Sequence, residues 1–390
     1  MPSVQWSPLV PSANHRSFRD NLFVENDVQS PRRLGPWFWF KFVLGLALLA
    51  LAGVKLHDLY QDWLANPQQV TFDGYAFALS ATVYFAALLL TFYRWFVLVH
   101  ALELPFGFGD SLRLGFVGFV SSLLAPGSVT GDLVKMGFIA TEQKRRAAAI
   151  ATIVADRLIG LYALFLVSAI LGAIFWREAW PNDWLRRMLL LIWGVTGGGG
   201  VGLLILLYVP HPFDWLVPRL GRFAKIARML AELAEALQQY RYRPLTLAWA
   251  LFLGMLGHAG FVLSFYLCAV ALRGPVAPPP LYLHFLFIPI GMVFQAVPLT
   301  PGGNAGANEN FFDWLYKLVD PNFKLGVLIT LLQRAVTWTV GLLGLVWYIP
   351  LRQKTKRAKA QAAMQAAEVA VEPVPPSPLA TQEAPHETVS

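Results

Sequence analysis

The sequence is poor in charged residues and almost free of cysteine. Only 14% of its 390 residues are charged, against roughly 25% in a typical soluble domain. The single cysteine, Cys268, can form no internal disulfide and no zinc cluster. Hydrophobic residues make up 56% of the chain instead. This composition excludes an ordinary cytosolic enzyme, a disordered regulator and a disulfide scaffold, and it predicts an all-α polytopic membrane protein.

Enzyme motifs are also lacking. The chain has no nucleophile elbow, no phosphate loop and no paired-metal carboxylate motif, so we expect no cofactor and no metal. The absence of motifs favours a non-enzymatic role, although catalytic residues spread over several helices remain an alternative. No apolar segment with a small-residue cleavage site follows Met1, so we expect no signal peptide. The net charge of +8 is explained by membrane topology, and we expect no nucleic-acid partner.

Six apolar runs are long enough to cross a bilayer, which takes about 20 helical residues. They are Trp37–Val54, Tyr75–Leu102, Ala147–Trp176, Met188–Val209, Leu245–Leu272 and Leu325–Ile349. We therefore predict a transmembrane domain over residues 37–350 with six full crossings.

Two further apolar stretches, at about 111–140 and 281–318, are interrupted by proline and glycine. The breaks are Pro126-Gly127 and Pro301-Gly302-Gly303. Proline cannot continue a helix, and the second half of each stretch is too short to cross the membrane. We predict two re-entrant hairpins, with each turn at membrane depth and surrounded by protein.

The distribution of basic residues orients this arrangement. If the N-terminus is cytoplasmic and both hairpins return to the side they entered from, 18 Lys and Arg lie in cytoplasmic segments and 7 lie outside. A full crossing at either hairpin would place one basic cluster on the wrong face. We predict a multi-pass protein of the cell membrane (an inner or plasma membrane) with both termini in the cytoplasm.

Three segments flank or interrupt the apolar domain. Residues 1–36 form a polar cytoplasmic segment, and the tail 351–390 begins basic and then has a composition typical of disorder. An amphipathic cytoplasmic helix is predicted at about 213–240. Its basic residues are Arg219, Arg222, Lys225 and Arg228. It either lies on anionic headgroups of the inner leaflet or packs on the bundle, and the sequence leaves both alternatives open.

The predicted topology contains an inverted repeat. One hairpin enters from the cytoplasm between an inward and an outward crossing, and the other enters from outside between an outward and an inward crossing. The separations Pro126 to Arg157 and Pro301 to Arg334 nearly match. Many secondary transporters build a central site from inverted repeats with broken helices, whose half-helix N-termini suit an anionic group.

Charged residues within the apolar segments are the candidate binding residues, because charge at the bilayer centre needs a partner or a wet cavity. They are Asp132, Lys135, Asp156, Arg157, Glu309 and Arg334. Arg157 and Arg334 could pair with Asp132 and Glu309, or bind a lipid phosphate with two parallel hydrogen bonds. We expect Arg94 and Lys135 to reach the interface by snorkelling. His258 and His284 are predicted to be hydrogen-bonded packing residues.

At these positions the chain resembles the flippase-like family that includes the transmembrane region of lysylphosphatidylglycerol synthase. Gly131-Asp132-Leu133-Val134-Lys135 is similar to the family's Gly-Asp-x-x-Arg, with Lys135 in place of arginine. Asp156-Arg157 resembles its Asp-Arg helix. The segment from Pro298 to Glu309 resembles its Pro-Gly-Gly-x-Gly-x-x-Glu, with one extra residue between Gly303 and Gly306. Glu309 matches the glutamate of the motif only if this residue is treated as an insertion; in an alignment without a gap, Asn308 takes that place.

The resemblance covers about residues 37–350 and implies a flippase or transporter that moves a polar-headed, anionic lipid between leaflets. Membrane lipids are then its expected partners, and its oligomeric state stays open. Aminoacyl transfer would need the soluble domain of the synthase, and we expect none after Ile349. The alternatives are an intramembrane lipid-modifying enzyme, such as a glycosyltransferase with a lipid-linked donor, and a structural subunit without a substrate.

Overall fold

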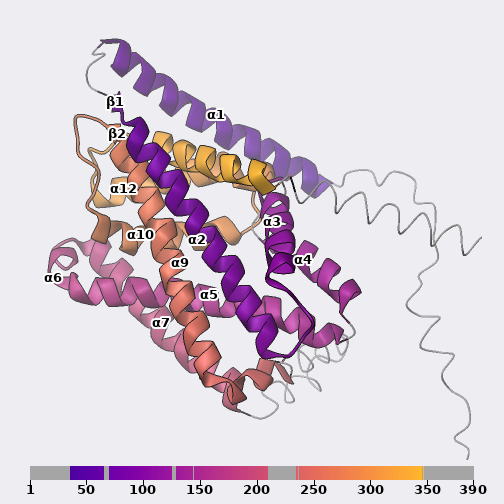
Figure 1. The fold of residues 1–390 in the computed structure, drawn as a ribbon. Helices are drawn as coiled ribbons and strands as arrows, with labels where there is room; N and C mark the ends of the chain where they lie inside the picture. The colour runs from indigo at the N-terminus through magenta and orange to yellow at the C-terminus, as the bar shows by residue number, and fades with distance from the viewer. Residues whose placement is uncertain are drawn as a thin grey trace, which may run out of the picture.

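A computed structural model of the protein describes residues 36–65, 70–124, 129–143, 145–209, 234–235, 237–344 and 346. Within them the chain is almost entirely helical (Figure 1). The main helices are α1 (Pro36–Ala65), α2 (Gly74–Ala101), α3 (Phe108–Leu124), α4 (Val129–Glu142), α5 (Arg146–Ile174), α7 (Asp183–Tyr208), α9 (Pro244–Ala271), α10 (Leu281–Ala296), α12 (Ala307–Val319) and Gly326–Gly344. The short elements are β1 (Thr71–Phe72), α6 (Trp176–Ala179), η2 (Gln239–Tyr242), β2 (Leu272–Arg273) and α11 (Pro301–Asn304).

Five helices are long and apolar enough to cross a membrane: α2, α5, α7, α9 and Gly326–Gly344. They coincide with five of the six predicted crossings, which confirms a membrane protein with several apolar helices. The sixth predicted crossing, Trp37–Val54, lies inside α1, a continuous helix of 30 residues. Several predicted features lie outside the described residues: the first 35 residues, the break at Pro126-Gly127, Arg219, Arg222, Lys225 and Arg228 of the amphipathic helix, and the tail from 347 onward.

Contacts between the helix ends identify the two opposite ends of the bundle. At one end the Arg145 guanidinium donates to the carbonyl of Leu102, 3.0 Å away, and to the amide of Gln239, also 3.0 Å away. We call this the Arg145 end. At the opposite end β1 pairs with β2 in antiparallel register, with Thr71 opposite Arg273. We call this the Arg273 end. Asp73 caps α2 there, and the backbone N–H of Ala76 holds the pKa of its carboxyl below the ordinary value.

The two broken stretches start and finish at opposite ends of this bundle. The ring of Phe108, where α3 begins, packs against Tyr93, and Gln143, just after α4, donates to the carbonyl of Pro105. The pair α3–α4 therefore opens at the Arg145 end. Tyr282, where α10 begins, stacks on Phe175 at the other end. The Tyr316 hydroxyl near the end of α12 donates to His284 of α10 over 3.0 Å, so this second pair opens at the Arg273 end.

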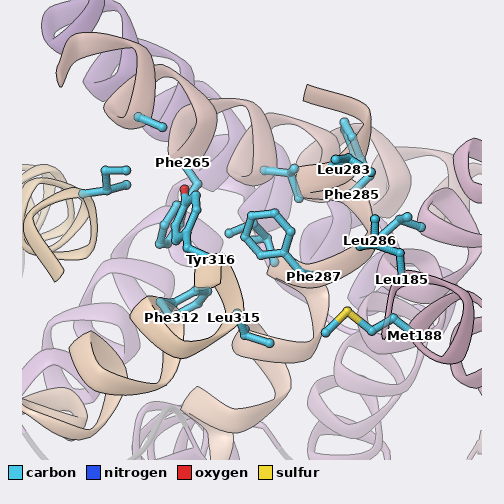
Figure 2. Packing of buried hydrophobic residues seen from close by; sticks show 14 of the residues in the cluster. Leu185, Met188, Phe265, Leu283, Phe285, Leu286, Phe287, Phe312, Leu315 and Tyr316 are labelled. Carbon is cyan, nitrogen blue, oxygen red and sulfur yellow. The ribbon is translucent and has the colours of Figure 1, made fainter. Parts of the chain in front are cut away.

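The largest hydrophobic cluster lies around the second helix pair. Phe265 of α9, Phe287 of α10 and Phe312 of α12 are buried together there (Figure 2). Tyr240, at the described end of the predicted amphipathic segment, is buried as well, and its hydroxyl donates to the carbonyl of Leu98. That part of the segment packs on the bundle.

Helix α1 lies along one face of the molecule, against α11 and α12 (Figure 1). It passes directly over Gly306, whose φ is +79° and where a Cβ atom would lie 2.6 Å from the backbone nitrogen of Leu49. Asn310 donates to the carbonyl of Leu48 over 2.9 Å, and Lys55 pairs with the buried Asp313 at 2.7 Å. Only glycine combines this positive φ with so close a backbone approach, so the second helix pair is shaped to receive α1.

Candidate functional site

The first half of the site is a three-residue ion cluster between α4 and α5. Asp132, in the first turn of α4, accepts from Lys135 one turn later at 2.9 Å and from the Nε of Arg157 on α5. The Lys135 ammonium also lies 5.0 Å from the ring centroid of buried Trp95. The expected snorkelling of Lys135 is therefore wrong, because its side chain is only 14% exposed and is held between Asp132 and the indole ring.

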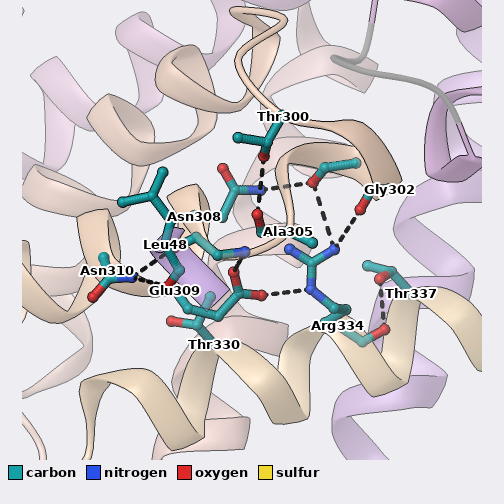
Figure 3. A network of polar contacts seen from close by, with 12 residues as sticks. Leu48, Thr300, Gly302, Ala305, Asn308, Glu309, Asn310, Thr330, Arg334 and Thr337 are labelled. Atoms are coloured by element: carbon teal, nitrogen blue, oxygen red, sulfur yellow. Dashed lines mark hydrogen bonds and ion pairs between the residues drawn. The ribbon is translucent and has the colours of Figure 1, made fainter. Parts of the chain in front are cut away.

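The second half is an ion pair between α12 and the helix Gly326–Gly344. The Nε of Arg334 donates to Glu309 over 2.5 Å, and its terminal nitrogen donates to the carbonyl of Gly302 over 2.9 Å (Figure 3). The other oxygen of Glu309 accepts from the backbone N–H of Gly306 at 2.7 Å. The Glu309 side chain is only 1% exposed. Glu309, and not Asn308, therefore supplies the carboxylate, while Asn308 donates to the carbonyl of Gly303.

The break in the second pair is a turn held by a buried side chain. Asn304 is fully buried, and its oxygen accepts from the backbone N–H groups of Leu299 and Thr300, at 3.0 and 3.1 Å. Its nitrogen donates to the carbonyls of Gln295 and Val297. Gly302 and Gly303 have left-handed φ values of +68° and +64°. The predicted break is confirmed, and its irregular backbone is satisfied inside the protein.

The two helix pairs meet at their inner ends. A Cβ atom on Gly303 would lie 3.4 Å from the carbonyl oxygen of Leu123 and 3.7 Å from that of Ser122, so the second break lies against the last turn of α3. The acid and the arginine are 25 residues apart in both halves, Asp132 to Arg157 and Glu309 to Arg334. The two predicted pairings are thus confirmed and are built in the same way.

A third ion pair lies deeper in the bundle. The Nε of Arg94 donates to Asp156 over 2.8 Å, and both side chains are about 95% buried. Arg94 therefore does not snorkel, as the sequence suggested, but crosses from α2 to α5. Asp156 and Arg157, which are adjacent on α5, thus have separate partners on different helices, as their helical geometry requires.

The position that corresponds to this third pair in the other half is uncharged. Gln333 immediately precedes Arg334, as Asp156 precedes Arg157. Its side-chain oxygen accepts from Ser264 and from Cys268 of α9, each at 3.3 Å. Arg94 and Ser264 are both the 21st residue of 28-residue helices. The equal lengths of the two helices indicate that Arg94 and Ser264 occupy corresponding positions. The sequence alone could not show that the buried Ser264 faces Gln333.

The two intramembrane histidines differ. His284 is fully buried, and its ring nitrogens bond the Pro280 carbonyl and the Tyr316 hydroxyl, which confirms its prediction as a packing residue. The Nδ1 of His258 is buried and has no hydrogen-bond partner among the described residues. His258 interacts electrostatically with Arg94 and Arg157. His258 also forms a hydrogen bond with the backbone of Gly160, so it is hydrogen-bonded as predicted, through its ring although not through the Nδ1.

The charged groups of the three ion clusters leave a positive excess. Four cations (Arg94, Lys135, Arg157 and Arg334) face three carboxylates (Asp132, Asp156 and Glu309), a balance of +1. The two arginines that pair beside the broken helix pairs differ in exposure: the Arg157 side chain is 48% exposed and that of Arg334 only 19%. An apolar region with a net positive charge attracts an anion, and Arg157 is the more exposed of these two arginines. Among the described residues no group of three or more His, Cys, Asp and Glu side chains could hold a metal ion.

A comparison with known families agrees with this geometry. The family model described as the lysylphosphatidylglycerol synthase TM region matches residues 38–344, which contain all three ion clusters. No curated protein and no solved structure matches the chain.

Proposed function

Since the chain belongs to the family of the lysylphosphatidylglycerol synthase TM region and is a membrane protein linked to lipid handling, we propose that it is a flippase that moves a polar-headed, anionic lipid between leaflets. The observation that carries the proposal is the meeting of the two broken helix pairs. Gly303 of one pair lies against the last turn of α3 in the other, and each pair has an acid–arginine contact beside it. A polar region at which two helix pairs from opposite ends of the bundle meet suits a headgroup that must pass through it.

The charge of this region supports an anionic headgroup. The four cations and three carboxylates leave one positive charge, and a phosphate diester would neutralise it. Arg157 is the residue we assign to the phosphate, because its planar guanidinium donates two parallel hydrogen bonds and its side chain is half-exposed. Lys135 and Asp132 hold it in place. In the second half Arg334 corresponds to Arg157 and Glu309 to Asp132, and the Arg334 side chain is less exposed.

The proposed orientation places the Arg145 end in the cytoplasm and the Arg273 end outside. Six crossings, including α1, and two re-entrant pairs then form an inverted repeat with both termini in the cytoplasm. The proposal rests on the division of the basic residues, 18 against 7. The two helix pairs open at opposite ends of the bundle, as an inverted repeat requires.

Cysteine labelling tests this orientation. We expect a membrane-impermeant maleimide to label Asn322→Cys in intact cells, and to label Gly109→Cys only after lysis, because the two exposed positions lie at opposite ends. Gly109 has room for a side chain, since a Cβ atom there meets nothing within 4 Å. The native Cys268 is fully buried and gives a low background. Labelling of Gly109→Cys in intact cells would contradict the orientation.

Reconstitution tests the activity itself. We expect the purified protein to move a fluorescent phosphatidylglycerol across liposome membranes, measured as the fraction that an impermeant quencher reaches. Liposomes without protein are the control. Lipid extracted afterwards should be chemically unchanged in mass. Movement no faster than in the control contradicts the proposal, and a covalently altered lipid would favour the lipid-modifying enzyme instead.

A further inference from the structure

Helix α4, which carries the acid of the first half of the site, has an exposed side. Val129 lies three residues before Asp132 and Leu133 one residue after it, and they are 47% and 61% exposed. Residues four apart lie on the same side of a helix, so the two exposed residues mark one face. The first acid–arginine pair therefore lies beside an exposed helix face, and its arginine, Arg157, is half-exposed.

In the second half, α1 covers the corresponding side of α12. Gly306 and Asn310 stand three residues before Glu309 and one residue after it. A Cβ atom on Gly306 would lie 2.9 Å from the Cβ of Leu48, and Asn310 donates to the carbonyl of the same leucine. The N–H of Gly306 in turn holds Glu309, so α1 lies directly over a partner of the second acid. The less exposed of the two arginines, Arg334, belongs to the half that α1 covers.

Helix α1 has little apolar contact with the bundle. Among its residues whose side chains the structure describes, only Gly45 and Ala52 are buried, and its large apolar residues are mostly exposed. In a bilayer such side chains face lipid whether or not α1 is docked, so moving α1 sideways transfers none of them to water. Elements with few buried contacts are the ones that separate at low free energy. Separation of α1 from α12 is therefore less costly than removal of a core helix.

The polar contacts of α1 with Asp313 and Asn310 can also be broken without leaving a buried charge alone. Asp313 accepts from Lys55 of α1 at 2.7 Å and from Lys317, one turn later on α12, at 3.0 Å. Asn310 donates to a carbonyl of α1 and also to the carbonyl of Gly306, 2.8 Å away. When α1 leaves, each of these side chains keeps a partner on α12. The large cost of stranding a buried carboxylate is thereby avoided.

We propose that α1 is a lateral gate for the second half of the site, which leaves α12 to let the lipid headgroup reach Glu309 and Arg334. This inference rests on the proposed function. With α1 docked, the helix face beside the first acid–arginine pair is exposed and the one beside the second is covered. A transporter that takes one substrate from two leaflets needs its two halves to be accessible in turn, and α1 supplies that difference.

Asp313 is the residue that makes the gate reversible. It pairs with Lys55 and Lys317 while α1 is docked, and with Lys317 alone when α1 has left. The first half has Met136 at the place of Asp313, four residues after the acid. The extra carboxylate is thus present in the half that α1 covers and absent from the equivalent position of the other half.

Thiol labelling of the purified full-length protein measures how often α1 is undocked. Ala52→Cys places a thiol on the buried side of α1. Gly53→Cys is the matched control at the same depth, because this residue is exposed and a Cβ atom there meets nothing within 4 Å. We expect N-ethylmaleimide to label Ala52→Cys about tenfold more slowly than Gly53→Cys, since the thiol reacts only while α1 is undocked. The native Cys268 is fully buried.

Two lysine variants should shift the labelling of Ala52→Cys in opposite directions. Lys55→Met removes the ion pair of α1 and leaves Lys317 beside Asp313, so labelling should be faster than in the parent. Lys317→Met leaves Lys55 as the cation that pairs with Asp313. Undocking then strands a buried carboxylate, and labelling should be about tenfold slower. Neither variant should melt much earlier than the parent, because Asp313 keeps one cation in each.

Transport in liposomes, normalised to folded protein, completes the test. The initial rate of phosphatidylglycerol movement should fall about tenfold in Lys317→Met, in proportion to the undocked fraction, and should not fall in Lys55→Met. Equal labelling in the two lysine variants overturns the inference. Lys317→Met protein that labels slowly but transports at the wild-type rate also overturns it and leaves the flippase standing. A wild type that moves no lipid contradicts the proposed function, whereas opposite labelling shifts would still support an α1 that docks and undocks.

Discussion

Replacing Arg334 by alanine should cost the protein about 3–5 kcal/mol of folding free energy, because it strands a buried carboxylate. Glu309 is only 1% exposed, and Arg334 is the cation that pairs with it at 2.5 Å. The carbonyl of Gly302 loses its donor in the same variant. A loss of this size approaches the whole stability of many domains. Thermal melting followed by size-exclusion chromatography should show little folded protein.

Two further variants identify the cause of this loss. Adding Glu309→Gln to Arg334→Ala removes the stranded charge and keeps an acceptor for the N–H of Gly306, so most of the folded protein should return. Arg186→Ala is the surface control, because its partner Asp183 is 68% exposed and such pairs contribute only about 0–1 kcal/mol. If Arg334→Ala melts like Arg186→Ala, Glu309 and Arg334 are not a buried pair in the folded protein.

Replacing Arg157 by lysine should reduce lipid transport about tenfold or more and leave folding unchanged. Lysine keeps the positive charge beside Asp132 but loses the planar fork that binds a phosphate with two hydrogen bonds. The loss of one charge-assisted hydrogen bond corresponds to roughly that factor. The readout is the initial rate of phosphatidylglycerol movement in liposomes, normalised to the amount of folded protein. Normal transport by a well-folded Arg157→Lys protein would contradict the role of the guanidinium and leave a structural ion pair.

The two arginines should differ when each is replaced by alanine. Asp132 keeps Lys135 at 2.9 Å after Arg157 is removed, whereas no second cation pairs with Glu309 among the described residues. Arg157→Ala should therefore destabilise the protein less than Arg334→Ala, although both residues occupy equivalent places in the sequence. Equal melting temperatures of the two alanine variants would mean that Lys135 does not stabilise Asp132.

Much of this arrangement could be predicted because it is local or periodic in the sequence. Apolar runs specify the long helices, and the Pro-Gly breaks end helices wherever they occur. The pairing of Arg157 with Asp132, and of Arg334 with Glu309, follows from the high cost of isolated charge in an apolar region together with the small number of available partners. These features need no knowledge of how distant helices pack.

The rest depends on contacts between helices far apart in the chain. Depth along a helix suggested that Arg94 could snorkel, but the side chain turns inward because Gly160 and Gly254 leave space for it. The role of Asn304 in the second break follows from four backbone groups that no motif specifies. The docking of α1 over Gly306 is likewise set by tertiary structure. A single sequence gives residue types and spacing, not the neighbours that decide which way a side chain turns.

The relative transport of two headgroups by one protein sample tests the central claim most directly. Liposomes that contain the wild-type protein should carry fluorescent phosphatidylglycerol and, in a parallel sample, phosphatidylcholine with the same label. The surplus positive charge and the guanidinium of Arg157 predict that the anionic lipid moves about tenfold faster, since the zwitterionic lipid brings its own cation to the site. Equal rates for the two lipids, or faster movement of phosphatidylcholine, would contradict an anion-selective site between the two broken helix pairs.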